Sequence, residues 1–302
     1  MVRIVRATQV EIESAVQALR DGELVAFATE TVYGLGANAQ NPAAVAKIFE
    51  AKGRPPNHPV IVHLDSPRFL HRWVREVPEV AMRLAERFWP GPFTMVMPRA
   101  ANVHDVITGG PTRAEHVREE LGDAVRVILD GGECQIGLES TIVSFEGNGV
   151  RLLRPGSVTA TQISAVVGEL FSDDGRPVPR VPGSPPTHYA PTTHMTIVPA
   201  GEIDAQADAA SSGGRRVAVL AQRLPLRAHK YATWINAGRR PENYGRDLYA
   251  NLRTLDKAGC RRILVQAVPD GERWDAIRDR LVHAATSVAE SDDGSGAMAV
   301  LP

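Results

Sequence analysis

A cluster of polar residues in the first quarter of the chain has the composition of a ligand site. The stretch 29–36 reads Thr-Glu-Thr-Val-Tyr-Gly-Leu-Gly, so eight residues supply two hydroxyls, a carboxylate, a phenol and two glycines. It follows an apolar run of strand length and leads towards a predicted helix, and open α/β proteins bind ligands at such strand ends. Lys52 and Arg54 follow that helix, and His63 ends a further apolar run. We expect these residues to share one site.

Each of these residues also has a plainer explanation. Lys52 and Arg54 lie where cations offset the dipole at the C-terminus of a helix. His63 at the end of a strand is more often a hydrogen-bonded structural residue than a ligand. Threonine favours strands, yet Gly34 and Gly36 follow so closely that the backbone is expected to turn around a ligand.

Several familiar chemistries are excluded by missing partners. Ser140 has no histidine base arranged for a serine hydrolase. The glycines at 34 and 36 do not make a dinucleotide fingerprint, and no phosphate-binding Gly-x-x-x-x-Gly-Lys-Ser/Thr motif occurs. Cys134 and Cys260 lie far apart without metal-type spacing, so neither a disulfide framework nor a zinc site is indicated. We expect both cysteines to be small core residues.

Composition is that of a globular protein with two domains. The chain has 302 residues, of which 43% are hydrophobic and 23% charged. Its 34 basic and 35 acidic residues nearly cancel, so no global attraction to nucleic acid or an anionic membrane is expected. No signal-like segment and no apolar run long enough for a transmembrane helix is visible. We therefore expect a cytoplasmic protein without membrane association.

Capping residues and apolar periodicity predict the elements that must position the polar cluster. Thr8 and Glu11 have the spacing of a capping box that opens a helix to about residue 20. The run 24–28 is a short strand, and Asn41-Pro42 opens a helix that ends before Gly53. The segment 88–92, Phe-Trp-Pro-Gly-Pro, ends a helix and seats a strand, and we assign it no chemistry. Further elements are expected as a buried strand over 58–63, a helix over 78–88, a strand over 93–97, a helix over 112–121, strands over 125–129, 139–143 and 150–153, and a helix over 159–167.

A proline-rich segment divides the chain. Residues 173–191 carry six prolines and two glycines with little periodicity, which indicates a stiffened linker. We expect a first domain over 1–172, a linker or lid over 173–193 and a second domain over 194–302. The second domain alternates strands with helices, which predicts a small parallel sheet. Its expected strands are 195–198, 216–220, 233–236 and 263–266, and its expected helices are 246–257 and 274–288.

Seven short motifs occur in one order along the chain. They are Thr-Glu-Thr-Val-Tyr-Gly-Leu-Gly at 29–36, Lys-Gly-Arg-Pro at 52–55, the apolar run that ends in His63, Phe-Trp-Pro-Gly-Pro at 88–92, Gly-Leu-Glu-Ser-Thr at 137–141, Leu-Arg-Pro-Gly at 153–156 and His-Tyr-Ala-Pro at 188–191. Together they resemble the YrdC/Sua5 family, the threonylcarbamoyl-AMP synthases, in its two-domain Sua5 form. The resemblance covers nearly the whole chain. It implies a YrdC-like α/β fold, with a twisted open mixed sheet and flanking helices, and a smaller Rossmann-like α/β domain at the C-terminus.

The resemblance implies a nucleotidyltransferase reaction. Proteins of this family condense L-threonine, bicarbonate and ATP to threonylcarbamoyl-AMP and pyrophosphate, which supplies the t6A37 modification of tRNA. Mg2+ is expected with the triphosphate, held mainly by phosphate oxygens and water and not by a protein metal site. tRNA and the downstream threonylcarbamoyl-transferase proteins are further expected partners.

The resemblance also implies a role for each matching residue. The threonine substrate would be contacted by Thr31, His63 and either Ser140 or Thr141. The ATP phosphates would be held by Lys52 and Arg54, which are also the expected catalytic pair, because arginine offers forked donors and lysine a point charge. The expected further nucleotide contacts are His58, Arg154 and, in a segment folding back over the site, Tyr189.

One family segment is absent from this sequence. The family has a Val-Arg-x-Pro strand, a helix and a Ser-Ala-Asn loop between the strand after Trp-Pro-Gly-Pro and the helix that opens here at Thr112, but Gly110 runs directly into Pro111. The absent Arg and Ser would contact threonine and ATP. Either the protein has a true deletion, or the printed sequence omits residues that the protein contains, and we favour omission. A non-catalytic RNA-binding module and a degenerate paralogue that binds nucleotide without turnover stay open as alternative functions.

Overall fold

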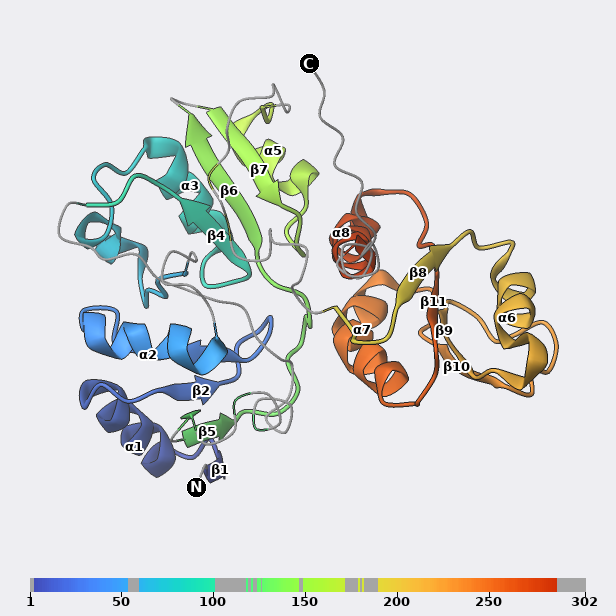
Figure 1. Cartoon of the computed structure of the whole chain (residues 1–302). Helices are drawn as coiled ribbons and strands as arrows, with labels where there is room; N and C mark the ends of the chain where they lie inside the picture. The colour runs from blue at the N-terminus through green and yellow to red at the C-terminus, as the bar shows by residue number, and fades with distance from the viewer. Residues whose placement is uncertain are drawn as a thin grey trace, which may run out of the picture. The chain divides into compact units, whose positions relative to one another are not determined.

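The chain forms two compact units, over Met1–Pro182 and Gly183–Pro302. The computed structural model describes residues 3–53, 60–100, 127–146, 149–171 and 190–286, together with the single positions 118, 121, 124, 125, 179 and 181 (Figure 1). Each unit is described by itself below. The expected helix over 112–121 and most of the linker over 173–193 lie outside these residues.

The first sheet of the N-terminal unit has four strands in the order β1-β5-β2-β3. Strands β1 (Arg3–Arg6), β5 (Val127–Asp130) and β2 (Val25–Phe27) run parallel, and β3 (Gly34–Gly36) pairs with β2 antiparallel. Helix α1 (Gln9–Arg20) packs on one face through Ala15 and Ala18. Helix α2 (Pro42–Lys52) packs on the other through Ile48. The stretch 29–36 thus leaves β2 between the two helices and returns as β3.

Both helices begin and end where their capping residues predict. The Thr8 side chain accepts from the backbone N–H of Glu11 at the start of α1. The Asn41 side chain accepts from Ala43 and Ala44 at the start of α2, and Gly53 ends that helix in the left-handed conformation at φ 59°. Capping of this kind satisfies backbone groups that lack intrahelical partners. It fixes Lys52 as the last residue of α2.

The second sheet of the same unit has three strands in the order β4-β6-β7. Strand β4 (Phe93–Val96) is parallel to β6 (Thr141–Glu146), which pairs with β7 (Gly149–Arg154) antiparallel. Helices α3 (Glu79–Phe88) and α5 (Ala160–Val167) pack together with this sheet, and a short 3-10 helix, η1, spans Pro67–Arg72. Thr159 caps α5 with a complete capping box. The expected α/β fold with mixed sheet and flanking helices is confirmed, and the described residues of this unit form two mixed sheets.

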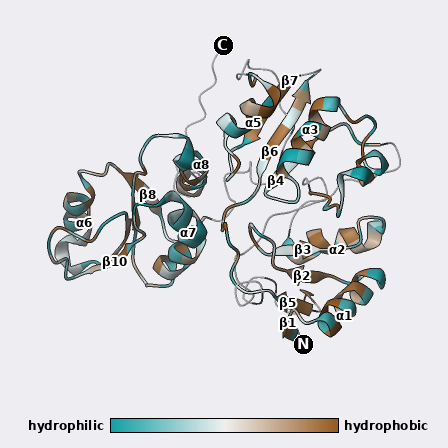
Figure 2. Cartoon of the chain, turned by 180° about the vertical axis from the view of Figure 1, so that it is seen from behind, coloured by the Kyte–Doolittle hydropathy of each residue, from teal (hydrophilic) through white to brown (hydrophobic). Residues whose placement is uncertain are grey.

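The C-terminal unit is a parallel sheet in the order β10-β9-β11-β8. Its strands are β8 (Met195–Val198), β9 (Val217–Ala221), β10 (Ala232–Asn236) and β11 (Ile263–Gln266). Alternate residues of β9 pack against α6 (Ile203–Ser211), while α7 (Pro241–Asp256) and α8 (Glu272–Thr286) pack against the sheet and each other. Every residue of β9 is buried, as a strand covered by helices on both faces must be. Figure 2 shows the apolar colouring concentrated on the strands, with polar and apolar sides on the helices.

The prediction of a strand over 58–63 was wrong for residues 60–63, which are the part of this range that the structure describes. Residues 60–64 have no regular secondary structure, and residues 60–62 are only half-buried. An apolar run becomes a strand only when a neighbouring strand pairs with it, and among the described residues none does. The sequence analysis missed strands β1 and β3 and helix α6. Each of these elements is short, and β3 and α6 contain little apolar periodicity. No helix among the described residues is long and apolar enough to cross a membrane.

Candidate functional site

The turn after β2 is held by the side chain of Thr29. Its hydroxyl donates to the Val32 carbonyl at 2.6 Å and accepts from the backbone N–H groups of Thr31 and Val32. The Thr29 and Thr31 hydroxyl oxygens lie 2.8 Å apart. Because Thr29 has already given its one proton to Val32, Thr31 must be the donor in this pair. The lone pairs of the Thr31 oxygen then receive no donor from the described residues.

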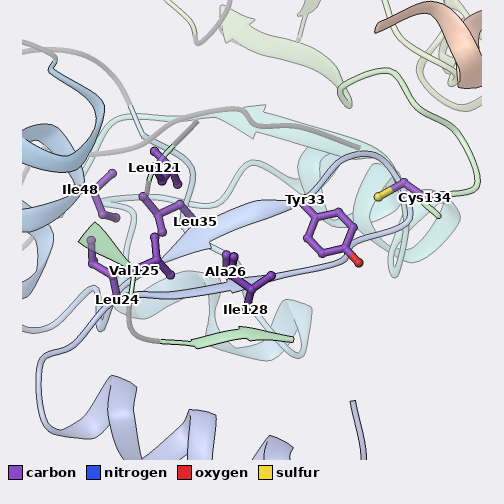
Figure 3. Packing of buried hydrophobic residues seen from close by; sticks show 9 residues of the cluster. All are labelled: Leu24, Ala26, Tyr33, Leu35, Ile48, Leu121, Val125, Ile128 and Cys134. Atoms are coloured by element: carbon purple, nitrogen blue, oxygen red, sulfur yellow. The ribbon is translucent and has the colours of Figure 1, made fainter. Parts of the chain in front are cut away.

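Tyr33 ties this turn to the end of β5. Its ring is completely buried and lies between the aliphatic residues of the core and Cys134 (Figure 3). Its hydroxyl lies 3.1 Å from Asp130 Oδ1 and 3.0 Å from the Gly132 carbonyl, and accepts from the Gly131 N–H at 3.2 Å. Burial, together with the nearby Asp130 charge, raises the pKa of Tyr33, so the phenol stays protonated as a donor. Tyr33 is therefore part of the scaffold and not a group facing a ligand.

The segment 131–140 runs from β5 past the Thr29–Val32 turn to Ser140. The N–H of Ile136 donates to the Glu30 carbonyl and the N–H of Gly137 donates to the Thr31 carbonyl, both at 2.9 Å. Cys134 is buried in this segment, and burial raises the pKa of its thiol to about 11. Cys134 and Cys260 are both buried and free, as expected for core residues. Ser140 lies three residues after Gly137, so the two Cα atoms are within about 11 Å of each other.

Ser140 sits where all three strands of the second sheet meet. Its hydroxyl oxygen lies 2.7 Å from Thr94 Oγ1 on β4. The buried Arg154 at the end of β7 donates through Nε and Nη2 to the Ser140 carbonyl, at 3.1 and 2.9 Å, and through Nη2 to the Ser140 hydroxyl at 3.3 Å. An added Cβ at Gly156 would come within 2.8 Å of the Ser140 carbonyl carbon, so only glycine fits there. Ser140 is held from two sides.

Thr141, next to Ser140, is engaged internally. It is completely buried, its hydroxyl donates to the Val158 carbonyl at 2.7 Å, and the Val158 N–H donates back at 3.1 Å. Its own N–H donates to the Pro92 carbonyl at 2.9 Å. Between the two neighbouring hydroxyls, these contacts favour Ser140 as the one that faces a ligand.

His63 and Glu30 influence each other electrostatically. Surrounding protein lowers the pKa of His63 by desolvation, and the charge of Glu30 opposes that shift. The residue is nevertheless exposed. A side chain can touch water on one side and still lose hydration to protein packed around the rest. His63 is therefore neutral at pH 7 and offers one ring nitrogen as a donor and the other as an acceptor.

The remaining predicted site residues divide into two groups. Lys52 ends α2, half-buried, after the turn that Gly53 makes. Arg54, His58 and Tyr189 lie outside the described residues, so their predicted nucleotide contacts stay predictions. Thr94 was not predicted at all. Its only sequence signal is its position two residues after Trp-Pro-Gly-Pro, a motif to which we assigned no chemistry.

Comparison with known families covers both units. A family model for Sua5, YciO and YrdC proteins, described as "Telomere recombination", matches residues 17–113 and 109–156. A second model, described as "Threonylcarbamoyl-AMP synthase, C-terminal domain", matches residues 158–286.

Individual relatives match over most of their length. A Bacillus subtilis protein named threonylcarbamoyl-AMP synthase is 36% identical, over 91% of this chain and 93% of its own. A Pyrococcus abyssi protein of the same name is 33% identical, over 92% of this chain and 95% of its own. The crystal structure of P. abyssi Sua5 complexed with L-threonine matches with a TM-score of 0.84 at 31% identity, covering 95% of this chain and 98% of that one.

The matches also bear on the missing segment. The B. subtilis alignment spans 321 positions, but 91% of 302 residues is only about 275, so about 46 positions hold no residue of this chain. The first family model matches in two pieces that meet at residues 109–113, the place where the sequence indicated a missing segment. The chain matches the second family model as well as the first, and it matches relatives along most of their length. It therefore belongs to the Sua5 family in its two-domain form.

Proposed function

We propose that this chain is an L-threonylcarbamoyladenylate synthase of the nucleotidyltransferase class. The amine of L-threonine attacks bicarbonate or CO2 to form a carbamate with loss of water or a proton, and a carbamate oxygen then attacks the α-phosphorus of ATP. Pyrophosphate leaves and threonylcarbamoyl-AMP forms. Family membership supports the reaction, and the complex of P. abyssi Sua5 with L-threonine supports the substrate.

The observation that carries the proposal is a pair of hydroxyls with complementary hydrogen-bonding roles. The Thr31 hydroxyl donates its proton to Thr29, so the Thr31 oxygen can only accept a hydrogen bond from a ligand. Ser140 accepts from the Arg154 guanidinium, which polarises its O–H towards a further acceptor. The segment 131–140 links the two residues. An amino acid carries both a donor, its ammonium group, and an acceptor, its carboxylate, and therefore matches such a pair.

In the proposed site, cationic side chains bind the nucleotide. Lys52 and Arg54 are proposed to hold the phosphates and to stabilise charge on the departing pyrophosphate. His58, Arg154 and Tyr189 are proposed further nucleotide contacts, and Arg154 in addition braces Ser140.

Mg2+ is proposed to accompany ATP. Among the residues that the structure describes, no three His, Cys, Asp or Glu side chains could hold a metal ion together. In nucleotide sites Mg2+ is held mainly by triphosphate oxygens and water. When bound, the metal would neutralise phosphate charge.

A substitution at Lys52 separates phosphate binding from helix capping. Lys52→Ala should lower kcat/KM for ATP by at least about tenfold, because a cation beside the phosphates is lost. The measurement is pyrophosphate release with ATP, Mg2+ and bicarbonate, which should require L-threonine.

Lys257→Ala is the matched control, since Lys257 caps the end of α7 in the other unit. It removes a cation from the end of a helix, a dipole contribution of about 0.3–1 kcal/mol to stability, and should leave kcat/KM for ATP unchanged. Equal effects of the two substitutions would assign Lys52 to capping alone, and pyrophosphate release without threonine would contradict the proposed function.

The missing segment favours one second candidate, a paralogue that binds nucleotide without turnover. The B. subtilis alignment holds about 46 positions without a residue of this chain, and the first family model breaks at residues 109–113. Calorimetry that detected ATP binding to a protein with no threonine-dependent pyrophosphate release would select this candidate. tRNA and downstream threonylcarbamoyl-transferase proteins are proposed as later partners of the product.

A further inference from the structure

The Thr94 hydroxyl has a single partner among the described residues. Thr94 Oγ1 lies 2.7 Å from Ser140 Oγ, and either atom can be the donor on distance alone. Thr94 belongs to β4, whose backbone is fixed by parallel pairing with β6. The hydroxyl is thus placed by the sheet, independently of the segment that carries Ser140.

Proton counting decides the direction of this bond when a ligand is present. The guanidinium of Arg154 can only donate, so Ser140 Oγ is its acceptor at 3.3 Å. Within the described part of the chain, the acceptor in reach of the Thr94 proton is Ser140 Oγ. If Thr94 donates, Ser140 accepts twice and keeps its own proton for the ligand. If Ser140 donated to Thr94 instead, the Ser140 proton would not be available to a ligand, and the Thr94 proton would have no acceptor among the described residues.

The Ser140 backbone does not depend on Thr94. Arg154 holds the Ser140 carbonyl with two hydrogen bonds, at 3.1 and 2.9 Å. The next residue, Thr141, is anchored to Pro92 and Val158. Removing the Thr94 hydroxyl should therefore change the rotamer and proton direction of Ser140 and leave its main chain in place.

We propose that Thr94 is a positioning residue for L-threonine, which orients Ser140 so that the Ser140 O–H donates to the carboxylate of the substrate. This inference rests on the proposed function and deepens it. Thr94 itself touches no substrate in this scheme. Its effect should fall on threonine and spare ATP, because the contact it controls belongs to threonine alone.

The test compares Thr94→Val with Thr94→Ser. Valine keeps the β-branched shape that suits a strand and removes only the hydroxyl, whereas serine keeps the hydroxyl. Thr94→Val should raise KM for L-threonine by about tenfold, the size expected for weakening one hydrogen bond to a charged group. KM for ATP should change less than about twofold, and Thr94→Ser should restore most of the threonine affinity.

Two further measurements keep failure of the inference apart from failure of the proposed function. Calorimetric binding of L-threonine needs no turnover and should show the same loss for Thr94→Val and the same rescue for Thr94→Ser. Thr233→Val, on β10 of the other unit, is the matched strand control and should leave both KM values unchanged. Wild-type protein that binds no threonine would overturn the function and the inference together.

Three outcomes would overturn the inference while the function stands. They are unchanged threonine affinity in Thr94→Val, equal losses for threonine and ATP, and a Thr94→Ser variant as weak as Thr94→Val. A lowered melting temperature with equal losses would assign Thr94 to the fold alone. The inference is supported if Thr94→Val weakens the binding of threonine but not of ATP and Thr94→Ser restores the threonine affinity.

Discussion

At the residue scale, the direction of each hydrogen bond determines what the site can bind. Thr31 and Ser140 are both hydroxyl residues, and their identities alone do not distinguish donor from acceptor. The neighbours decide: Thr29 takes the proton of Thr31, whereas Arg154 occupies a lone pair of Ser140. In the proposed site these two side chains therefore have opposite roles, Thr31 as an acceptor and Ser140 as a donor.

Tyr33 provides a residue-scale test of the scaffold. Tyr33→Phe should lower the free energy of unfolding by about 1–3 kcal/mol, because the Gly131 N–H and the half-buried Asp130 carboxylate lose a partner. Urea unfolding measures this loss. Tyr231→Phe is the control, since Tyr231 is 40% exposed and should shift stability by less than about 0.5 kcal/mol. Equal stability of the two variants would mean that the Tyr33 hydroxyl does not secure the turn.

At the element scale, a polar cluster around the buried Asp204 and His229 side chains fixes the loop between β9 and β10 to α6. His229 lies between Asp204 and Asp208 of α6, with ring nitrogens 3.1 and 2.7 Å from their carboxylates, and stacks on Trp234. Asp204 also accepts from Arg223 at 2.5 Å and from the Leu226 N–H at 2.8 Å. The loop needs this cluster because it holds Leu224 and Leu226 out in solvent, 69% and 78% exposed, and so gains little from apolar burial.

The pH dependence of stability tests this cluster. Burial raises the pKa of Asp204, but hydrogen bonds from His229, Arg223 and Leu226 outweigh it and lower the pKa from 3.8 to about 2. The folded carboxylate therefore contributes stability that is fully present above pH 3.8 and is lost as the pH falls towards about 2.

Asp204→Asn should flatten the fall in stability over this window, because asparagine does not titrate. Urea unfolding of the C-terminal unit at a series of pH values measures the slope. Asp270→Asn, at a carboxylate fully exposed to solvent, is the control and should keep the wild-type slope. An unchanged slope in Asp204→Asn would assign the acid sensitivity to other carboxylates.

At the scale of the whole molecule, the missing segment bears on how the N-terminal unit is built. The described residues form two sheets, β1-β5-β2-β3 and β4-β6-β7, and the break at 109–113 lies between β4 and β5. The absent segment is expected to contain strands. Such strands would cover apolar edges that the shortened chain leaves, and stability of only about 5–15 kcal/mol tolerates little uncovered surface.

Intact mass decides between omission and deletion. We expect the protein made from its own gene to exceed the 32.6 kDa of the printed sequence, because the omitted residues complete the site. Peptide mapping across residues 109–113 should then find additional sequence there. A mass of 32.6 kDa with the Gly110–Pro111 junction intact would establish a true deletion and would favour the paralogue that binds nucleotide without turnover.

The local features of this protein follow from sequence alone. Thr8, Asn41 and Thr159 open their helices as predicted, because capping depends on groups only a few residues apart. The strands 195–198 and 263–266 match residue for residue, because a short run rich in apolar residues is a strong local signal. The ordered motifs identified the family, which the comparisons confirmed.

What joins distant parts of the chain was decided only by the tertiary structure. The run 60–63 has strand composition but found no strand to pair with among the described residues. Thr94 reached Ser140 through the parallel pairing of β4 with β6, a contact across 46 positions that no local pattern encodes. A sequence fixes which hydroxyls a chain carries, but the proton each one offers depends on neighbours that folding brings from elsewhere.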